Sequence, residues 1–259
     1  MKRREIRSDI AWATPKKIVI HGLDLCEDIV GKVDFGQMSF LLVFGRLPHA
    51  NEARMFNAVM VILMEHGITP SSLATRLTYS GAPEAVQGAV AAGLLGLGSV
   101  FAGSLDNAAR MLQQALPDPG NPGDLDRIAA ETVTAFRSRK EIIPGIGHPF
   151  HKPIDPRAPK LFQVAEETGF SGPYVDLMKK IGAEAERQYQ RVLPINVTGA
   201  MAAVASQFGL PWNVCRGLSV AARAMGLVGH IIEEARQPMA DEIYARLEDE
   251  ASAHLRPKE

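Results

Sequence analysis

A short run in the middle of the chain combines residue types that can move a proton and hold an anion. Residues 144–148 read Pro-Gly-Ile-Gly-His, and Lys152 and an Asp-Pro-Arg run at 155–157 follow closely. A Gly-x-Gly turn lets the backbone approach a ligand closely, because glycine carries no Cβ. Histidine transfers protons near neutral pH, and arginine binds a carboxylate through two hydrogen bonds. The run predicts an enzyme that acts on a polyanionic acid. The alternative is a proline-rich surface turn that happens to contain a histidine.

Three further polar clusters interrupt segments with a helical pattern of apolar residues. They are Glu65-His66-Gly67, then Asn196-Val197-Thr198-Gly199, and then Arg223 with His230. His66 at a helix end can simply interact with the helix dipole, and Thr198 can simply cap the following helix. Arg223 is harder to explain structurally, because a buried guanidinium needs an anionic partner and no acid lies one turn away on its helix. Together with the central run, these clusters form the candidate site.

The composition describes a globular protein without a strong charge bias. The 259 residues are 46% hydrophobic, which suits one large unit or two closely joined domains. The 28 Lys and Arg residues nearly cancel the 29 Asp and Glu residues, so no global field favours nucleic acid or an acidic membrane. No apolar run reaches membrane-spanning length, and the basic start lacks the apolar core of a signal peptide. We expect a cytoplasmic protein without nucleic-acid or membrane partners, and the histidines lack the spacing of metal ligands.

Helical periodicity dominates the chain. Helices are predicted over residues 52–65, 82–97, 106–115, 125–137, 160–168, 174–191, 198–208, 213–235 and 239–251, and only residues 17–21 read as a strand. The helix at 82–97 contains Gly88, Gly93 and Gly96, and each interior glycine costs about 0.5–1 kcal/mol against alanine. We expect close helix–helix approach to offset that cost. Prolines and glycines break the pattern at residues 116–123, and a second break is predicted near residues 209–212.

Taken in order, the four clusters resemble those of the citrate synthase family. The Gly-x-Gly-His…Asp-Pro-Arg motif is the most specific part of this resemblance. Residues 18–48, with Gly-Leu-Asp-Leu at 22–25 and Gly-Arg-Leu-Pro at 45–48, look like the family's opening, and the resemblance extends to about Tyr244. The short length and residues 94–109 resemble the citryl-CoA lyase module at the C-terminal end of ATP-citrate lyase more than a true synthase.

This resemblance implies a mainly α, multi-helical, citrate synthase-like fold. Residues 1–104 and 213–259 would form a large helical domain, residues 105–212 a smaller lid domain, and the substrate cleft would lie at their junction. The family's active site borrows an arginine from a second subunit, so a homodimer or a higher homo-oligomer is expected. The glycine- and alanine-rich helix at 82–97 suits tight pairing across a two-fold axis.

The resemblance also implies substrate-binding roles, residue by residue. His66 matches a histidine that holds the oxaloacetate portion. His148 matches the histidine that bonds the oxaloacetate carbonyl, or the citryl hydroxyl, and moves its proton. Arg157 and Arg223 match the arginines that clamp substrate carboxylates, and Arg236 matches the arginine contributed across the dimer interface.

Coenzyme A, as acyl-CoA substrate or product, is the ligand that the same resemblance implies. Its site would include Lys152, Gly145, Gly147 and Arg139, with Arg137 and Lys140 adding to the basic patch. Pro149 stands where relatives usually carry an arginine, which should weaken coenzyme A binding or reroute it. The family uses no metal.

Two departures from the family pattern decide the predicted reaction. Phe101 stands where a synthase has a histidine that bonds the acetyl-CoA thioester, and the lyase module also has phenylalanine there. Thr198 stands where both relatives carry the aspartate that shuttles the acetyl methyl proton. Condensation must remove that weakly acidic proton, and a positioned base contributes about 10²–10⁴-fold to such a step. Cleavage begins instead at the citryl hydroxyl, where His148 can act, and a water held by Thr198 can protonate the enolate.

The sequence therefore predicts a carbon–carbon lyase that cleaves citryl-CoA, or a related 3-hydroxy-3-carboxyacyl-CoA, to acetyl-CoA and oxaloacetate. Glu65, Asp155 and His151 are conceivable replacements for the missing acid, and the spacing selects none of them. The alternative function is a catalytically impaired citrate synthase-like protein that binds an acyl-CoA or a di- or tricarboxylate.

Overall fold

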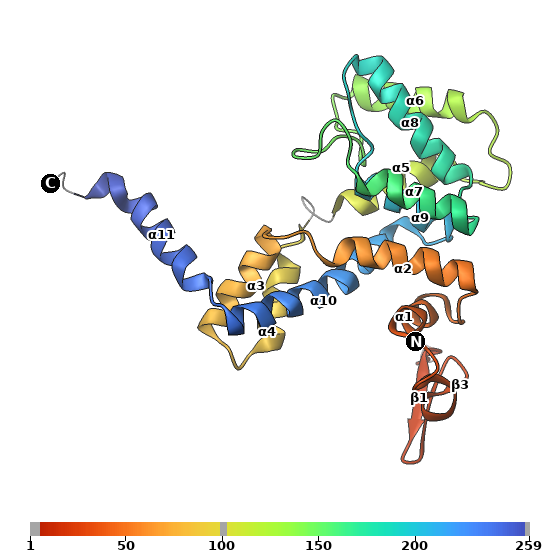
Figure 1. Cartoon of the computed structure of the whole chain (residues 1–259). Helices are drawn as coiled ribbons and strands as arrows, with labels where there is room; N and C mark the ends of the chain where they lie inside the picture. The colour runs from red at the N-terminus through yellow and green to blue at the C-terminus, as the bar shows by residue number, and fades with distance from the viewer. Residues whose placement is uncertain (1–5, 99–102, 257–259) are drawn as a thin grey trace, which may run out of the picture.

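The structure is a computed structural model that describes residues 6–98 and 103–256 (Figure 1). Within these ranges it consists mostly of helices, with one small sheet near the N-terminus. The helices are α1 (Phe35–Phe44), α2 (Ala50–Met64), α3 (Pro70–Gly81), α4 (Val86–Leu95), α5 (Gly103–Ala115), α6 (Leu125–Ser138), α7 (Arg157–Thr168), α8 (Pro173–Tyr189), α9 (Val197–Gln207), α10 (Cys215–Arg236) and α11 (Ala240–Ser252). The predicted mainly α class is confirmed, and the predicted breaks at 116–123 and 209–212 both fall between helices.

The small sheet is formed by β1 (Ala11–Thr14), β2 (Lys17–Ile20) and β3 (Leu23–Asp24), paired antiparallel in the order β1-β2-β3. The sequence predicted only β2, because β1 is exposed along its whole length and β3 has only two residues. A short π-helix, η1 (Leu25–Ile29), follows the sheet. The sheet lies beside α1 at one end of the molecule, away from α3 and α4 (Figure 1).

Two helices were not predicted, and each begins with a local signal that the apolar pattern does not contain. α1 carries apolar residues around most of its circumference, so no single stripe marks it, yet Asp34 caps it in a capping box. α3 begins at Pro70, the favoured first position of a helix, and Thr69 and Ser72 form its capping box. α7 begins at Arg157, three residues before the predicted start at 160. The arginine of the central run therefore lies on a helix and not in a loop.

The apolar core runs through α1, α2 and the helices from α5 to α10. α9 is its most buried element, because every residue from Gly199 to Ser206 is buried and most of them are small. α5, α7 and α8 pack against α9, and α6 packs against α8. The N-terminus of α9, which carries Asn196 and Thr198, is therefore held firmly in place beside the segment that carries His148.

The glycine-rich α4 packs closely against α3 and α10. A Cβ at Gly93 would lie 2.0 Å from Thr75 Oγ1 and 2.6 Å from Leu227 Cδ1. Ser71 Oγ also donates a 2.6 Å hydrogen bond to the Gly93 carbonyl. The predicted close helix–helix approach is confirmed at Gly93 within one chain, whereas pairing of α4 with a second copy stays a prediction.

The helices fall into two groups in space. In Figure 1, α5 to α9 gather on one side, whereas α3, α4 and the outlying α11 lie on the other, and α10 joins the two groups. The proposed boundaries of a large domain (1–104 and 213–259) and a lid domain (105–212) stay predictions, as does a cytoplasmic location. Among the described residues, no helix is both long and apolar enough to cross a membrane.

Candidate active site

Two glycines dock the His148 loop (residues 144–156) onto the start of α9. Gly145 and Gly147 have φ of +85° and +83°, a region where other residues are strained. The Gly147 amide donates to the Pro194 carbonyl at 2.7 Å, and the Asn196 amide donates to the Gly145 carbonyl at 3.0 Å. A Cβ at Gly145 would lie 2.6 Å from Gly199 Cα, so the close approach that this glycine permits is to the chain itself. Contact of these glycines with coenzyme A stays a prediction.

Asp155 ties the His148 loop, α7 and α9 together. Its carboxylate is fully buried and accepts hydrogen bonds from Arg157 Nε at 2.9 Å and Arg157 Nη2 at 2.9 Å. The Val197 amide donates to the same carboxylate at 2.8 Å. Burial alone would raise the pKa of Asp155, but the Arg157 guanidinium and the Val197 amide outweigh it and hold that pKa below its usual value. Asp155 is therefore ionised, and it fixes the Arg157 guanidinium beside His148, with Nη2 3.4 Å from Nε2.

Three histidines from two distant parts of the chain lie together. His66 Nε2 is 3.4 Å from His151 Nε2, and the ring centres of His148 and His151 are 4.4 Å apart. His148 Nδ1 accepts the amides of Phe150 at 3.1 Å and of His151 at 3.0 Å, and backbone amides can only donate, so neutral His148 carries its proton on Nε2. The longer 3.4 Å contact of Nε2 with Arg157 Nη2 then joins two donors and is not a hydrogen bond. Burial, and then the positive charge of neighbouring groups, lowers the pKa of both His66 and His148. Both rings are therefore neutral at pH 7.

Arg223 on α10 lies beside Glu65 at the end of α2. Its side chain is only 12% exposed, and Nη1 is 3.6 Å from Glu65 Oε2, which is longer than a hydrogen bond. Burial lowers the pKa of Arg223 more than the attraction of Glu65 raises it. Nη1 is buried and makes no hydrogen bond with any residue that the structure describes. The predicted role of Arg223 as a carboxylate clamp stays a prediction, with this unsatisfied donor in its favour.

Thr198 occupies the first turn of α9, but it is not the cap. Asn196 caps the helix, and its Oδ1 accepts the amides of Thr198 and Gly199, each at 3.1 Å. The Thr198 hydroxyl donates to the same oxygen at 2.6 Å. Because its proton is engaged, the hydroxyl oxygen can only accept a further hydrogen bond from a water or a ligand. A threonine held in this way cannot act as a base.

Several predicted site residues lie outside this cluster. Arg236 is exposed at the end of α10, with Nε 3.4 Å from the Ile232 carbonyl of the same helix. Lys152 is exposed on the His148 loop. Arg139 is also exposed, pairs with Glu141 at 2.8 Å and lines a cavity of about 590 Å³ beside α5 and α6. Phe101 lies outside the described residues.

A basic cavity that the sequence marked only in part lies beside the His148 loop. Its volume is about 360 Å³, and its lining includes three basic residues and one acid, beside Ile146 and Tyr189: Arg137, Lys140, Arg191 and Glu141. Arg137 and Arg191 each place a guanidinium 5.7 Å from the centre of the Tyr189 ring. The sequence predicts Arg137 and Lys140 as part of a basic patch but does not mark Arg191. Only the fold brings Arg191, which follows α8, to the end of α6.

This arrangement can bind a carboxylate and transfer a proton. Arg157 and Arg223 supply positive charge beside neutral histidines, and Thr198 supplies a hydrogen-bond acceptor at the start of α9. In the described part of the chain, no group of three or more His, Cys, Asp or Glu side chains is placed to hold a metal ion.

Comparison with known proteins gives one consistent family. Residues 32–246 match the family described as citrate synthase, C-terminal domain. The structure is similar to that of the citryl-CoA lyase from Hydrogenobacter thermophilus, with a TM-score of 0.80 and 33% sequence identity, covering 89% of this chain and 87% of that one. It is also similar to that of the ATP citrate lyase from Methanothrix soehngenii in complex with citrate and coenzyme A, with a TM-score of 0.72 and 23% identity, covering 91% of this chain and 40% of that one.

A curated relative covers a similar part of the chain. The probable ATP-citrate synthase subunit 1 of Neurospora crassa is 22% identical over an alignment of 237 positions, which covers 85% of this chain and 34% of that protein. The chain thus spans about a third of the length of this relative. The family match covers most of the chain and agrees with the fold and with the ordered polar clusters. This chain belongs to the citrate synthase family.

Proposed function

We propose that this protein cleaves citryl-CoA, or a related 3-hydroxy-3-carboxyacyl-CoA, to acetyl-CoA and oxaloacetate. The proposal rests on one observation: two arginines and three histidines cluster together, namely Arg157, Arg223, His66, His148 and His151. The likeness to a citryl-CoA lyase supports it, as does the likeness to an ATP citrate lyase that holds citrate and coenzyme A. A purely structural protein has no need of such a cluster.

The two arginines would hold the carboxylates of the substrate. Arg157 uses two side-chain N–H groups on Asp155 and keeps the rest of its five donors for a ligand. Among the residues that the structure describes, the ionic partner of Arg223 is Glu65 at the long distance of 3.6 Å, so a substrate carboxylate can offer it a shorter, charge-assisted hydrogen bond. A binding site for a di- or tricarboxylate follows from this pair.

Cleavage needs a base at the citryl hydroxyl and an acid at the departing carbon. As the hydroxyl proton leaves, the oxygen's electron pair forms the ketone of oxaloacetate. The carbon–carbon bond breaks, and its electron pair becomes the enolate of the acetyl thioester. The enolate carbon then takes one proton, so the overall reaction neither gains nor releases a proton.

We assign the proton transfer to His151. The sequence analysis gave the hydroxyl proton to His148, but Nδ1 of that ring accepts two amides and Nε2 carries the proton, so His148 is set to donate a hydrogen bond to the substrate oxygen. His66 and His151 face each other through Nε2 at 3.4 Å, where two N–H groups would repel, so one of them presents a lone pair. We give that lone pair to His151, because its ring lies beside that of His148, with 4.4 Å between the ring centres, and His148 donates to the same substrate oxygen. His151 would take the hydroxyl proton and then return it to the enolate.

The other two conceivable acids are already engaged. Asp155 is fully buried and bound to Arg157 and the Val197 amide. Glu65 accepts the backbone amides of His66 and Gly67. Asp155 cannot take up a proton without giving up one of its hydrogen bonds. Both amides bind Oε1 of Glu65, and a proton on Oε2 would remove the negative charge that faces Arg223 and His230. Both points favour His151.

The basic cavity beside the His148 loop suits the phosphates of coenzyme A. Arg137, Lys140 and Arg191 bring positive charge to it, and Tyr189 offers an aromatic face. Ile146 lines the same cavity, and its position in the chain is only two residues before His148. A coenzyme A bound there could extend its thioester toward the histidine cluster.

The proposal is tested by changing Thr198 and measuring turnover of citryl-CoA. We expect Thr198→Asp to raise turnover at least tenfold, because a carboxylate at this position adds a general acid–base group to an aligned cleft. Thr198→Val is the matched control of equal size, and it should not raise turnover. No gain with Thr198→Asp, combined with tight binding of citrate or coenzyme A by calorimetry, would favour the impaired, ligand-binding protein instead.

A further inference from the structure

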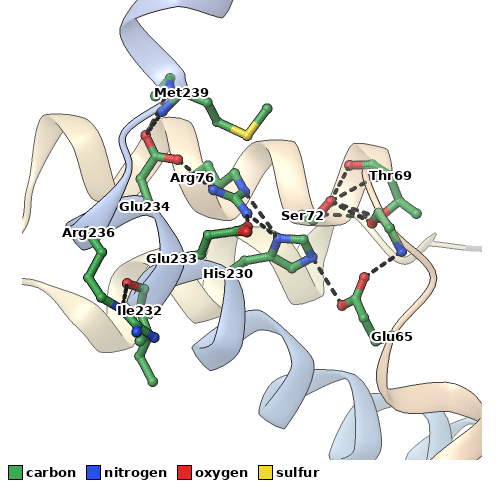
Figure 2. Close-up of polar contacts among 12 residues, drawn as sticks. Glu65, Thr69, Ser72, Arg76, His230, Ile232, Glu233, Glu234, Arg236 and Met239 are labelled. Atoms are coloured by element: carbon green, nitrogen blue, oxygen red, sulfur yellow. Dashed lines mark hydrogen bonds and ion pairs between the residues drawn. The ribbon is translucent and has the colours of Figure 1, made fainter.

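A chain of polar side chains leads from the candidate active site into the molecule along α3 and α10 (Figure 2). It runs from Glu65 through His230 and Arg76 to Glu234. We propose that Glu65 is a positioning residue that this buried chain holds in place, and that Glu65 in turn sets His66 and Arg223 for substrate binding. This inference rests on the proposed function, and it gives a role to residues that the proposed mechanism does not use.

Arg76 is the fixed centre of the chain. Its side chain is completely buried, and Nη1 donates to Glu234 Oε2 at 2.8 Å. The other oxygen of Glu234 accepts the amides of Met239 at 2.9 Å and Ala240 at 2.8 Å, where α10 gives way to α11. Glu233 also pairs with Arg76 but is mostly exposed. A buried guanidinium needs such a partner, so Arg76 cannot move without breaking a buried ion pair.

Arg76 determines which nitrogen of His230 carries the proton. Arg76 Nε and Nη2 lie 3.1 and 2.8 Å from His230 Nδ1. A guanidinium has donors and no acceptor, so Nδ1 must present its lone pair. The proton of the neutral ring is therefore on Nε2, which lies 3.0 Å from Glu65 Oε2. Nε2 makes no hydrogen bond with any residue that the structure describes, so this close contact with the carboxylate is an electrostatic one (Figure 2).

Glu65, held by His230, contacts two proposed substrate-binding residues, His66 and Arg223. Its Oε1 accepts the amides of His66 at 2.9 Å and Gly67 at 2.5 Å, which fixes the backbone that carries the His66 ring. Its Oε2 faces Arg223 Nη1 at 3.6 Å. The Glu65 side chain is 46% exposed, so burial alone does not hold it in one place. The two backbone amides hold Oε1, and His230, with Nε2 3.0 Å from Oε2, is placed to hold the other oxygen.

The test is the kinetics of Glu65→Gln with citryl-CoA. The amide keeps one oxygen for the His66 backbone but turns a donor toward His230 and Arg223, which are themselves donors. We expect KM to rise about tenfold, equivalent to about 1.4 kcal/mol of binding, with kcat changed less than threefold. Glu233→Gln is the matched control on the exposed side of Arg76, and its KM should stay within twofold of the wild type.

Substitutions of His230 supply a rescue experiment. Glutamine can accept from Arg76 and donate to Glu65, whereas leucine of similar size can do neither. We expect His230→Gln to keep KM within about threefold of the wild type and His230→Leu to raise it as Glu65→Gln does. Thermal melting of each variant shows that the folded protein is being compared.

Two outcomes would overturn the inference. One is a fall in kcat of a hundredfold or more in Glu65→Gln with unchanged KM, which would make Glu65 a proton donor. The other is equal KM values for His230→Gln and His230→Leu.

A readout that needs no turnover separates this inference from the proposed function. Histidine ¹⁵N NMR of the resting protein, with His230→Gln used for assignment, should show His230 protonated on Nε2 and not on Nδ1. A proton on Nδ1 would refute the chain even in an active enzyme. If the wild type does not cleave citryl-CoA, the proposed function fails, and the effect of Glu65→Gln on citrate affinity by calorimetry still decides the positioning role.

Discussion

Replacing Asp155 with asparagine should destabilise the protein strongly, because one buried carboxylate joins the His148 loop, α7 and α9. Asparagine keeps the size of the side chain but removes its charge and turns an NH2 group toward either Arg157 or the Val197 amide, both of which are donors. Breaking a buried ion pair from one side costs about 3–5 kcal/mol. The Arg157 side chain is 23% exposed, so water can partly solvate it, and we expect about 3 kcal/mol.

Thermal melting followed by circular dichroism, together with urea unfolding, measures this loss. For a chain of this size, about 3 kcal/mol corresponds to a fall in Tm of roughly 6–12 °C. Asp126→Asn is the matched control, because Asp126 pairs with Lys180 at 2.6 Å but its side chain is 80% exposed. The control should lose less than about 1 kcal/mol. A Tm for Asp155→Asn within 2 °C of the wild type would refute the assigned role of Asp155.

The pH dependence of the same difference has a definite sign. The pKa of Asp155 is held below its usual value of 3.8 in the folded protein, so the carboxylate stabilises the fold above that pH. The stability gap between the wild type and Asp155→Asn should be full at pH 7. It should shrink only below pH 3.8, as the pH falls through the lowered pKa. A gap that closes well above this pH would show that another group is responsible.

Three further predictions concern the same region. Gly145→Ala should lower the free energy of unfolding in urea by about 2–5 kcal/mol, because the new Cβ would clash with Gly199. Gly147→Ala has open space around its Cβ, so it should cost only the backbone strain of about 1–2 kcal/mol, and equal losses for the two variants would contradict this. NMR titration of the His66 and His148 rings should give midpoints below pH 6.5, because burial and neighbouring positive charge lower both pKa values; a midpoint above 6.5 for either ring would contradict this. Arg191→Ala should raise KM for citryl-CoA about tenfold and leave the affinity for citrate unchanged, because Arg191 is proposed to bind the phosphates of coenzyme A. A change in the affinity for citrate would contradict that role.

The sequence predicted most of the helices, because amphipathic periodicity records which face of a helix is buried. It missed α1, where apolar residues on most sides leave no stripe. It also missed α3, which is rich in Ser and Thr, and whose start is marked by Thr69 and Pro70 rather than by apolar residues. Capping residues carried the signal that periodicity lacked in both helices, together with Pro70 at the start of α3.

The sequence predicted the residues of the site but not the hydrogen bonds and ion pairs between them. The motif and its family resemblance named His66, His148, Arg157 and Arg223, and the structure brings these residues together. Which nitrogen of His148 carries the proton depends on backbone amides of a folded loop, and no sequence pattern records that. Arg236 lies apart within one chain, so its assigned place across a dimer interface remains to be tested on an assembly.

The sequence could not predict the buried chain of polar side chains behind Glu65, for a similar reason. Arg76 stands in an ordinary helical segment, and its partners follow it by more than 150 residues. Only the packing of α3 against α10 makes them neighbours. Arg191 reached the basic cavity in the same way, through the packing of α8 and α6.

Release of oxaloacetate from citryl-CoA by the purified protein, compared with His148→Ala, is the most direct test of the central claim. We predict measurable cleavage by the wild type and a loss of at least a hundredfold in His148→Ala, in which a positioned proton-bearing group is missing. The surface variant His254→Ala should keep the wild-type rate, since His254 is exposed beyond α11. Absence of oxaloacetate with the wild type, or an equal rate in His148→Ala, would contradict the assignment of this cleft as a citryl-CoA lyase site.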